Sequence, residues 1–147
     1  LTQTTGLNIF LEVDVAAEEL MVKMAYKGNS WLGFAAATSG AGKMNGADAV
    51  VGDPNAATPS IRRYTLGNHL PGSLQAGVYQ RQLRNATVST AGAYTVLEFR
   101  RPIAASGDDG VEIRSGDNTF LWAYGQPGAS FTARHKERNA YTVNLSA

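Results

Sequence analysis

The chain has 147 residues and a net charge of +1, which fits a single domain and gives no electrostatic reason to expect nucleic-acid binding. Charged residues make up only 17% of the sequence and glycine occurs 16 times, a composition that favours a turn-rich β-protein. There is no cysteine, so disulfides, thiolate metal sites, iron–sulfur clusters and covalently attached haem are excluded.

Alternation of apolar and polar residues is the strongest local pattern, and it predicts strands along most of the chain. It is clearest at residues 20–26, where it argues against a helix over residues 16–27. Lys27-Gly28-Asn29 is interpreted as a hairpin turn into the next strand. The expected strands cover residues 7–15, 20–26, 30–34, 47–51, 60–66, 79–88, 94–101, 110–114, 119–124 and 141–145. Nine or ten short strands between turn residues predict an all-β domain over residues 1–147, either a sandwich or a barrel.

Three common site patterns are incomplete in this chain. The segment Ser39-Gly-Ala-Gly42-Lys43 lacks the first glycine and the final Ser or Thr of a phosphate-binding P-loop. No Gly-x-Ser-x-Gly elbow is present, and His69 lies among turn residues, where a solvent-exposed loop is expected. The acidic residues Asp108, Asp109, Glu112 and Asp117 lack the order of an EF-hand. Nucleotide binding, serine hydrolysis and calcium binding are therefore not predicted.

Three segments carry a more specific pattern. They are Trp31-Leu-Gly-Phe, the run from Met44 through Asn-Gly-Ala-Asp-Ala-Val-Val to Gly52, and His135-Lys-Glu-Arg138. With these segments the chain resembles the DOMON domain family, specifically its haem-binding cytochrome branch, over the span from the first strand to the last. The resemblance implies an antiparallel β-sandwich of about ten strands with immunoglobulin-like architecture. It also implies one non-covalent b-type haem whose iron is held by Met44 and His135.

The chemistry of the two ligands agrees with that implication. A thioether paired with an imidazole fills both axial positions of the iron, which suits electron transfer rather than substrate binding. Taken alone, Met44 would be interpreted as core filler and His135 as part of a solvated basic turn. A sandwich can present both ligands from loops at one end of its sheets. The aromatic residues available as haem walls are Trp31, Phe34, Trp122, Tyr124 and Phe131. The candidates for contacting the haem propionates are Arg138, Lys43 and Tyr64.

The resulting hypothesis is a one-electron relay that serves a redox partner and is not itself an enzyme. The resemblance implies a flavin dehydrogenase or a transmembrane cytochrome as that partner, and an extracellular, cell-surface or periplasmic location. The chain begins at Leu1 without a signal-like apolar segment, so we expect any signal peptide or membrane segment to lie outside it. Direct membrane insertion by this segment is not expected. Arg62-Arg63 and Arg100-Arg101 are candidates for a surface that docks an acidic partner.

Two alternatives stay open. A sugar- or ligand-binding module without haem would use aromatic rings such as Trp31 and Trp122 for stacking. A structural subunit, or a homo-oligomer, would pair exposed strand edges with neighbouring chains. The triplets Asn85-Ala-Thr87 and Asn144-Leu-Ser146 match the N-glycosylation sequon and are consistent with a secreted eukaryotic protein.

Overall fold

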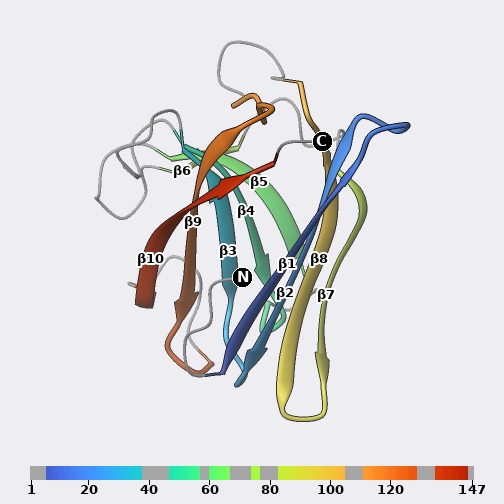
Figure 1. The fold of residues 1–147 in the computed structure, drawn as a ribbon. Helices are drawn as coiled ribbons and strands as arrows, with labels where there is room; N and C mark the ends of the chain where they lie inside the picture. Colours follow the sequence, from blue (N-terminus) through green and yellow to red (C-terminus); the bar gives the residue numbers. More distant parts are fainter. Residues whose placement is uncertain are drawn as a thin grey trace.

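The computed structural model describes residues 6–37, 47–56, 60–66, 74–76, 83–104, 111–128 and 135–145, and this part of the chain contains strands and no helix (Figure 1). The strands are β1 (Leu7–Asp14), β2 (Glu19–Lys27), β3 (Leu32–Ala36), β4 (Asp48–Asp53), β5 (Ser60–Leu66), β6 (Leu74–Ala76), β7 (Arg84–Ala91), β8 (Tyr94–Pro102), β9 (Asp117–Gly125) and β10 (His135–Asn144).

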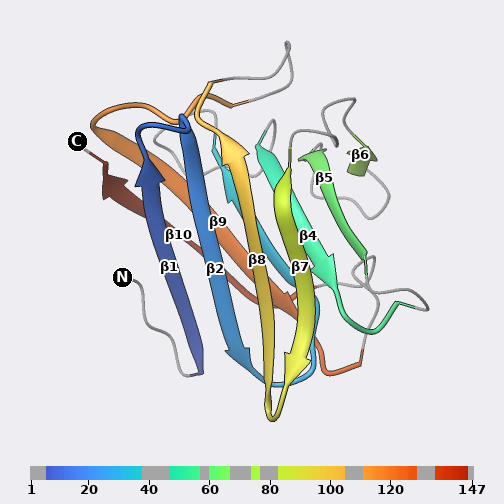
Figure 2. The same ribbon diagram turned by 90° about the vertical axis from the view of Figure 1, so that its right-hand side faces the viewer.

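The ten strands form two antiparallel sheets that face each other. One sheet has the order β1-β2-β8-β7 and the other has the order β10-β9-β3-β4-β5-β6. Figure 2 shows the two layers with their separate edges, so the fold is a sandwich and not a closed barrel. The prediction of an all-β antiparallel sandwich is confirmed.

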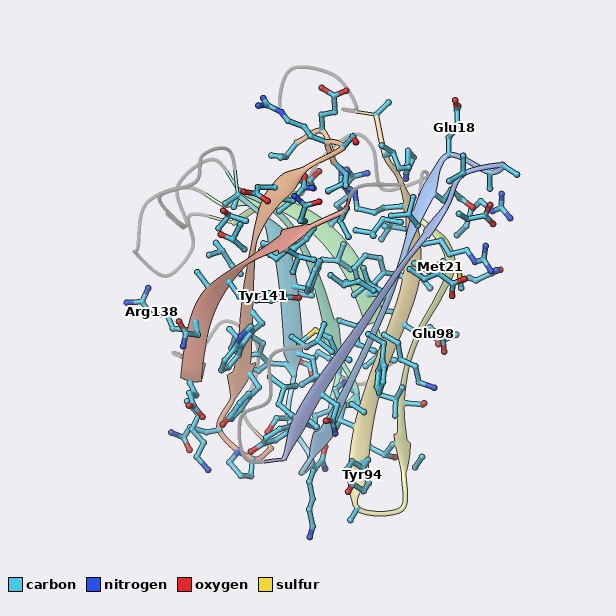
Figure 3. All side chains as sticks on the ribbon, in the orientation of Figure 1. Glu18, Met21, Tyr94, Glu98, Arg138 and Tyr141 are labelled. Carbon is cyan, nitrogen blue, oxygen red and sulfur yellow. The ribbon has the colours of Figure 1, made fainter. Side chains whose placement is uncertain are left out.

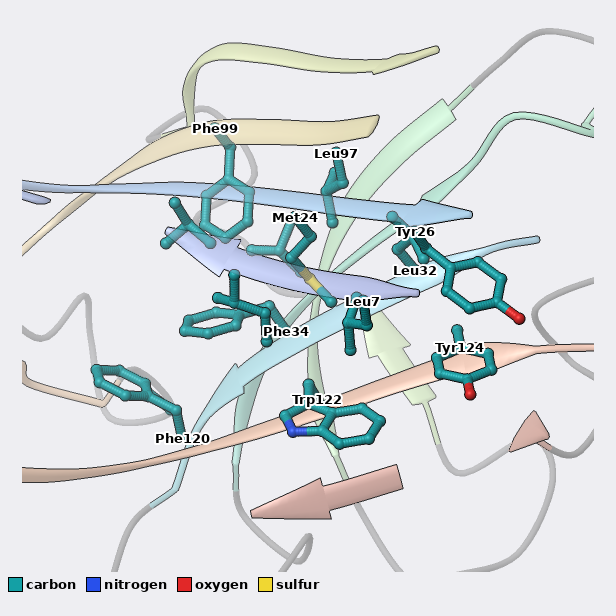
Figure 4. Close-up of a cluster of buried hydrophobic side chains, with 14 of the residues drawn as sticks. Leu7, Met24, Tyr26, Leu32, Phe34, Leu97, Phe99, Phe120, Trp122 and Tyr124 are labelled. Carbon is teal, nitrogen blue, oxygen red and sulfur yellow. The ribbon is translucent and has the colours of Figure 1, made fainter. Parts of the chain in front are cut away.

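Alternation along each strand builds the core between the sheets. In β2 the inward residues Leu20, Val22, Met24 and Tyr26 are buried, and they meet inward residues of β3, β8 and β9 (Figure 4). Met21 lies on the opposite face of β2 from Met24 and points outward (Figure 3). Each fully buried aliphatic or aromatic side chain contributes roughly 1.5–3 kcal/mol to folding, so this cluster is the main source of stability.

The connection after β2 differs from the prediction. β2 pairs with β1 and β8, whereas β3 pairs with β4 and β9, so Lys27-Gly28-Asn29 joins the two sheets and is not a hairpin turn. The hydroxyl of Thr95 donates to the Gly28 carbonyl oxygen at 2.5 Å and holds this crossing. A Cβ at Gly28 would lie 2.6 Å from Cε2 of Tyr26, so the crossing requires glycine.

Two other strand predictions differ from the structure: one segment is not a strand, and the last strand begins earlier. Residues 111–114 are not a strand, because Val111 and Arg114 donate their backbone N–H groups to the side chains of Asp48 and Asn118 instead of to a neighbouring strand. The last strand begins at His135 and not at residue 141, since its polar first half pairs along β9 at the sheet edge. The short strand β6 was not predicted.

Candidate functional site

The structure describes only some of the site residues that the sequence predicts. Met44, Lys43 and Phe131 lie outside the described residues, as does His69. The backbones of Tyr64 and His135 are described, in β5 and at the start of β10, but their side chains are not. The geometry of the site is therefore built from the strands that flank the two predicted iron ligands.

The flanks of the two ligands lie at opposite ends of β9. Ala36 pairs with Phe120, and Ala37 donates its N–H to the carbonyl oxygen of Thr119, whereas His135 pairs with Gly125. The five positions from Phe120 to Gly125 correspond to about 17 Å along the strand. The described strands that flank the two predicted ligands therefore reach opposite ends of β9, whereas loops at one end of the sheets were expected. That both ligands hold one group stays a prediction.

Three of the predicted wall residues belong to the core between the sheets. Phe34 lies opposite Trp122 in the β3–β9 pair, and Tyr124 lies two positions further along β9. The ring of Tyr124 stacks on Tyr26 with centroids 4.0 Å apart, and Phe34 packs 5.1 Å from Phe120 (Figure 4). These rings contact the opposite sheet, so their packing has a structural role. A role as haem walls stays a prediction.

The outward face of β3, β4 and β9 is lined by small residues. Ala35, Ala47 and Ala49 form a second apolar cluster with Leu121, separate from the core, and each of the three alanines is at most 4% exposed. Gly33 adds another position without a side chain on this face, beside Val51. Residues on the outward face of a sandwich are usually polar and solvated, so a buried floor of alanine and glycine is a distinctive feature.

Trp31 lies over one end of this floor. A Cβ at Gly125 would come within 2.0 Å of the indole Nε1 of Trp31, and a Cβ at Gly33 would lie 3.5 Å from its Cζ3. The indole therefore occupies the space above Gly125, the residue that pairs with His135. Trp31 is buried, and its Nε1–H has no hydrogen-bond partner among the described residues. A buried donor without a partner is costly, so this N–H is available to an acceptor on the same face.

Arg138 shares this outward face. It pairs with Ala123 of β9, a position that alternates with the inward residues Trp122 and Tyr124. Its side chain is exposed and points away from β10 (Figure 3). Among the predicted propionate contacts, Arg138 is the one whose side chain is described, and it lies three residues from His135 in the sequence.

Sequence reasoning missed a buried charge cluster next to the segment that carries Met44. The carboxylate of Asp48 accepts a hydrogen bond from Nε of Arg63 at 2.8 Å and lies 3.2 Å from Nη1 of Arg101. It also accepts the N–H of Val111 at 3.2 Å. All three charged side chains are at most 3% exposed. The signal in the sequence that could have revealed this cluster is the presence of charged residues inside otherwise apolar strands.

This cluster ties the two sheets together, because Asp48 and Arg63 come from β4 and β5 and Arg101 comes from β8. Asp48 is the first residue of β4 and follows Met44 by four positions in the sequence. The arginine pairs divide as alternation predicts: Arg62 and Arg100 reach the surface, while Arg63 and Arg101 are buried.

On the other side of the site, the hydroxyl of Tyr124 donates to the carboxylate of Glu137. This contact lies just after an irregularity between His135 and Glu137, where the pairing of β10 with β9 shifts. Burial, together with the hydrogen bond to Glu137, raises the pKa of Tyr124 above its usual range, so the phenol stays protonated at neutral pH. Among the described residues no group of three His, Cys, Asp or Glu could hold a metal ion, and no helix is long and apolar enough to cross a membrane.

Comparisons with known proteins agree with this fold. Solved structures with the same fold include the cytochrome b domain of pyranose dehydrogenase from Coprinopsis cinerea, which is 17% identical with a TM-score of 0.62, covering 95% of this chain and 75% of that one. They also include the cytochrome domain of cellobiose dehydrogenase from Myriococcum thermophilum, which is 13% identical with a TM-score of 0.64, covering 95% and 74%. A search among curated proteins found no match. The family model for the DOMON domain matches residues 3–125, and the chain belongs to this family.

Proposed function

We propose that this chain is an electron-transfer domain that binds one b-type haem without a covalent bond, with Met44 and His135 as the two iron ligands. When bound, the haem iron supplies reversible one-electron redox chemistry. The proposal is supported by membership of the DOMON family and by the likeness of the fold to two cytochrome domains. In this role the domain passes electrons to and from a partner and carries out no substrate chemistry itself.

The observation that carries the proposal is the outward face of β3, β4 and β9. Its alanine residues are buried although they face away from the other sheet, and their small side chains would let an apolar group pack close to the backbone of the sheet. The chain next to the two predicted ligands joins opposite ends of this face: Met44 precedes Ala47 by three residues, and His135 pairs with Gly125. Met44 and His135 would hold the haem from these two attachment points.

The polar groups at the margin of this face fit a haem with anionic propionates. The N–H of Trp31 is a buried donor that has no partner in the described part of the chain, and Arg138 supplies a cation on the same side of the sheet. Charge-assisted hydrogen bonds from such groups hold an anion more strongly than neutral ones do. Lys43 and Tyr64 are the further proposed contacts, from segments on either side of β4.

The protein scaffold also limits movement at the proposed site. The Asp48–Arg63–Arg101 cluster holds the chain directly after the Met44 segment, and the Tyr124–Glu137 contact holds the chain directly after His135. Both ligands are thus attached to anchored strands. A rigid attachment suits electron transfer, because the site has little to rearrange when the iron changes its oxidation state.

A redox partner protein or domain follows from the same proposal. The two cytochrome domains with this fold are parts of a pyranose dehydrogenase and a cellobiose dehydrogenase. We therefore propose a flavin dehydrogenase as the class of partner to test first, with a transmembrane cytochrome as the second, in an extracellular or cell-surface setting. Arg62 and Arg138 are exposed cations that could contact an acidic partner surface.

The deciding experiment is an absorption spectrum of the purified protein in oxidised and reduced forms. We expect a low-spin haem spectrum that is lost in His135→Ala and altered to a high-spin form in Met44→Ala. His69→Ala and Met21→Ala are the matched controls and should keep the spectrum of the unchanged protein. A protein that stays colourless after haem is added, or a His135→Ala variant with an unchanged spectrum, would contradict the proposal.

The sugar-binding alternative is weakened by burial. Stacking on a sugar requires an exposed aromatic face, yet Trp31 is 6% exposed and Trp122 is 1% exposed. Neither of the two rings considered for that role therefore presents a surface to a carbohydrate.

A further inference from the structure

The strand β7 is an edge of its sheet that carries no charge and no proline after Arg84. Natural sheets keep their edges from pairing with other chains by short edge strands, charged side chains, proline or bulges. Of the four edge strands that the structure describes, β6 has three residues, β1 carries Glu12 and Asp14, and β10 carries charges from Lys136 to Arg138. In β7 the residues after Arg84 include no charge and no proline over seven positions.

β7 is also held weakly by the core. Val88 is its one buried residue, and all of its other side chains are exposed. A long, uncharged, solvent-facing edge of this kind is where pairing with a second chain would start. Figure 2 shows β7 at the edge of its sheet, beyond β8, with β4 and β5 of the other sheet beside it.

A bulge at the start of β7 holds Asn85 in an unusual conformation. Arg84 pairs with Arg100 and Thr87 pairs with Glu98, so Asn85 and Ala86 together lie opposite the single residue Phe99. Asn85 has a φ of 50°, in the left-handed region that asparagine tolerates better than most residues. The bulge interrupts the pairing at Asn85 and Ala86, and these two residues and Thr87 are all exposed.

We infer that Asn85 carries an N-linked glycan, which shields the β7 edge from other chains. The inference rests on the secreted location included in the proposed function. The Nδ2 nitrogen of Asn85 would form a bond to the anomeric carbon of a lipid-pyrophosphate-linked oligosaccharide. The bond from that carbon to the pyrophosphate oxygen would break, the lipid pyrophosphate would leave, and the nitrogen would lose one proton. The hydroxyl of Thr87 completes the required triplet.

The second sequon is in a different environment. The Nδ2 group of Asn144 donates to Oδ1 of Asp117 at 2.9 Å, and the backbone N–H of Leu145 donates to the carbonyl oxygen of Gly116 at 2.8 Å. Asn144 is thus engaged in the pairing of β10 with β9, outside any bulge. Of the two sequons, the one at Asn85 is therefore assigned as the glycosylated one.

The test is peptide mapping of the full chain, exported from a eukaryotic host by an added secretory leader. We expect a glycan on the peptide with Asn85 and none on the peptide with Asn144. Thr87→Ala should abolish the glycan while leaving Asn85 in place. Asn85→Gly should also abolish the glycan, and glycine adopts a positive φ easily. Ser146→Ala is the matched control and should change nothing. An exported protein with bare Asn85 would overturn the assignment.

The shielding role has its own measurement. Protein whose glycan has been removed enzymatically should form larger particles in light scattering at high concentration than the glycosylated protein does. Thr87→Ala and unchanged protein from a bacterial host should scatter alike, because neither carries a glycan. Equal scattering before and after glycan removal would overturn the shielding role. A glycosylated but colourless protein would contradict the haem proposal and leave this inference standing.

Discussion

The indole of Trp31 lies directly over Gly125, so that a Cβ at position 125 would come within 2.0 Å of its Nε1. This close approach joins the start of β3 to the end of β9 at the point where His135 begins β10. It determines which residue can stand at position 125. It also places the indole N–H, which has no partner among the residues that the structure describes, next to the strand position that pairs with His135.

Gly125→Ala is expected to displace the indole and to destabilise the protein by about 1–3 kcal/mol, the usual cost of overpacking a filled site. Gly33→Ala is the matched control, because its nearest atoms would lie at ordinary contact distances of 3.5 Å and more. Urea unfolding of both variants measures the difference. Equal stabilities would show that Trp31 moves aside without cost.

Trp31→Phe should weaken haem retention by about tenfold or more, since the loss of a hydrogen bond to a charged group costs about 1.5–3 kcal/mol. The stability of the protein without haem should change less. Trp122→Phe should show the reverse pattern, because Trp122 is part of the core between the sheets. Haem transfer to an acceptor protein and urea unfolding together separate the two effects. Faster haem loss from Trp122→Phe than from Trp31→Phe would contradict a site on the outward face.

Asp48→Asn should lower the free energy of unfolding by about 3–5 kcal/mol, because it leaves the buried guanidinium groups of Arg63 and Arg101 without their carboxylate. Asp14→Asn is the control. Asp14 forms a partly exposed ion pair with Arg100 at 3.5 Å, and its loss should cost less than about 1 kcal/mol. Chemical unfolding of both variants tests the contrast. A small effect at Asp48 would mean that water or another group compensates for the buried charge.

Tyr141→Phe should stabilise the protein at neutral pH, because the buried hydroxyl of Tyr141 has no hydrogen-bond partner among the described residues. Burial also raises the pKa of Tyr141 above its usual value. The folded state therefore holds this proton more tightly than the unfolded state does. The contribution of the protonated Tyr141 hydroxyl to the free energy of unfolding is fully present below pH about 10, the usual pKa of tyrosine. It is lost as the pH rises beyond that point.

Unfolding measured from neutral to strongly alkaline pH checks this second effect. The alkaline loss of stability should be smaller in Tyr141→Phe than in the unchanged protein. Tyr94→Phe, at an exposed position, is the control and should leave the whole profile unchanged. A Tyr141→Phe profile that matches the unchanged protein at every pH would contradict both expectations.

Local pattern was sufficient to predict most of the strands and the class of fold. The alternation from Leu20 to Tyr26 follows directly from the geometry of a half-buried strand, and it predicted β2 and the inward direction of Met24 correctly. The motifs around Trp31 and Met44, both within the residues that the DOMON family model matches, indicated the family correctly. These features depend on residues that are close together in the sequence.

Strand pairing could not be predicted in the same way, because it depends on contacts between distant segments. The turn at Gly28 has the composition of a hairpin, yet the two strands it joins pack in different sheets. The register of β9 places the flanks of Met44 and His135 at opposite ends of one face, where loops at one end were expected. The burial of Asp48 beside Arg63 and Arg101 likewise exists only once β4, β5 and β8 meet. Short-range periodicity determines which face of a strand is apolar, whereas the free energy of packing one sheet on the other determines which faces and charges meet.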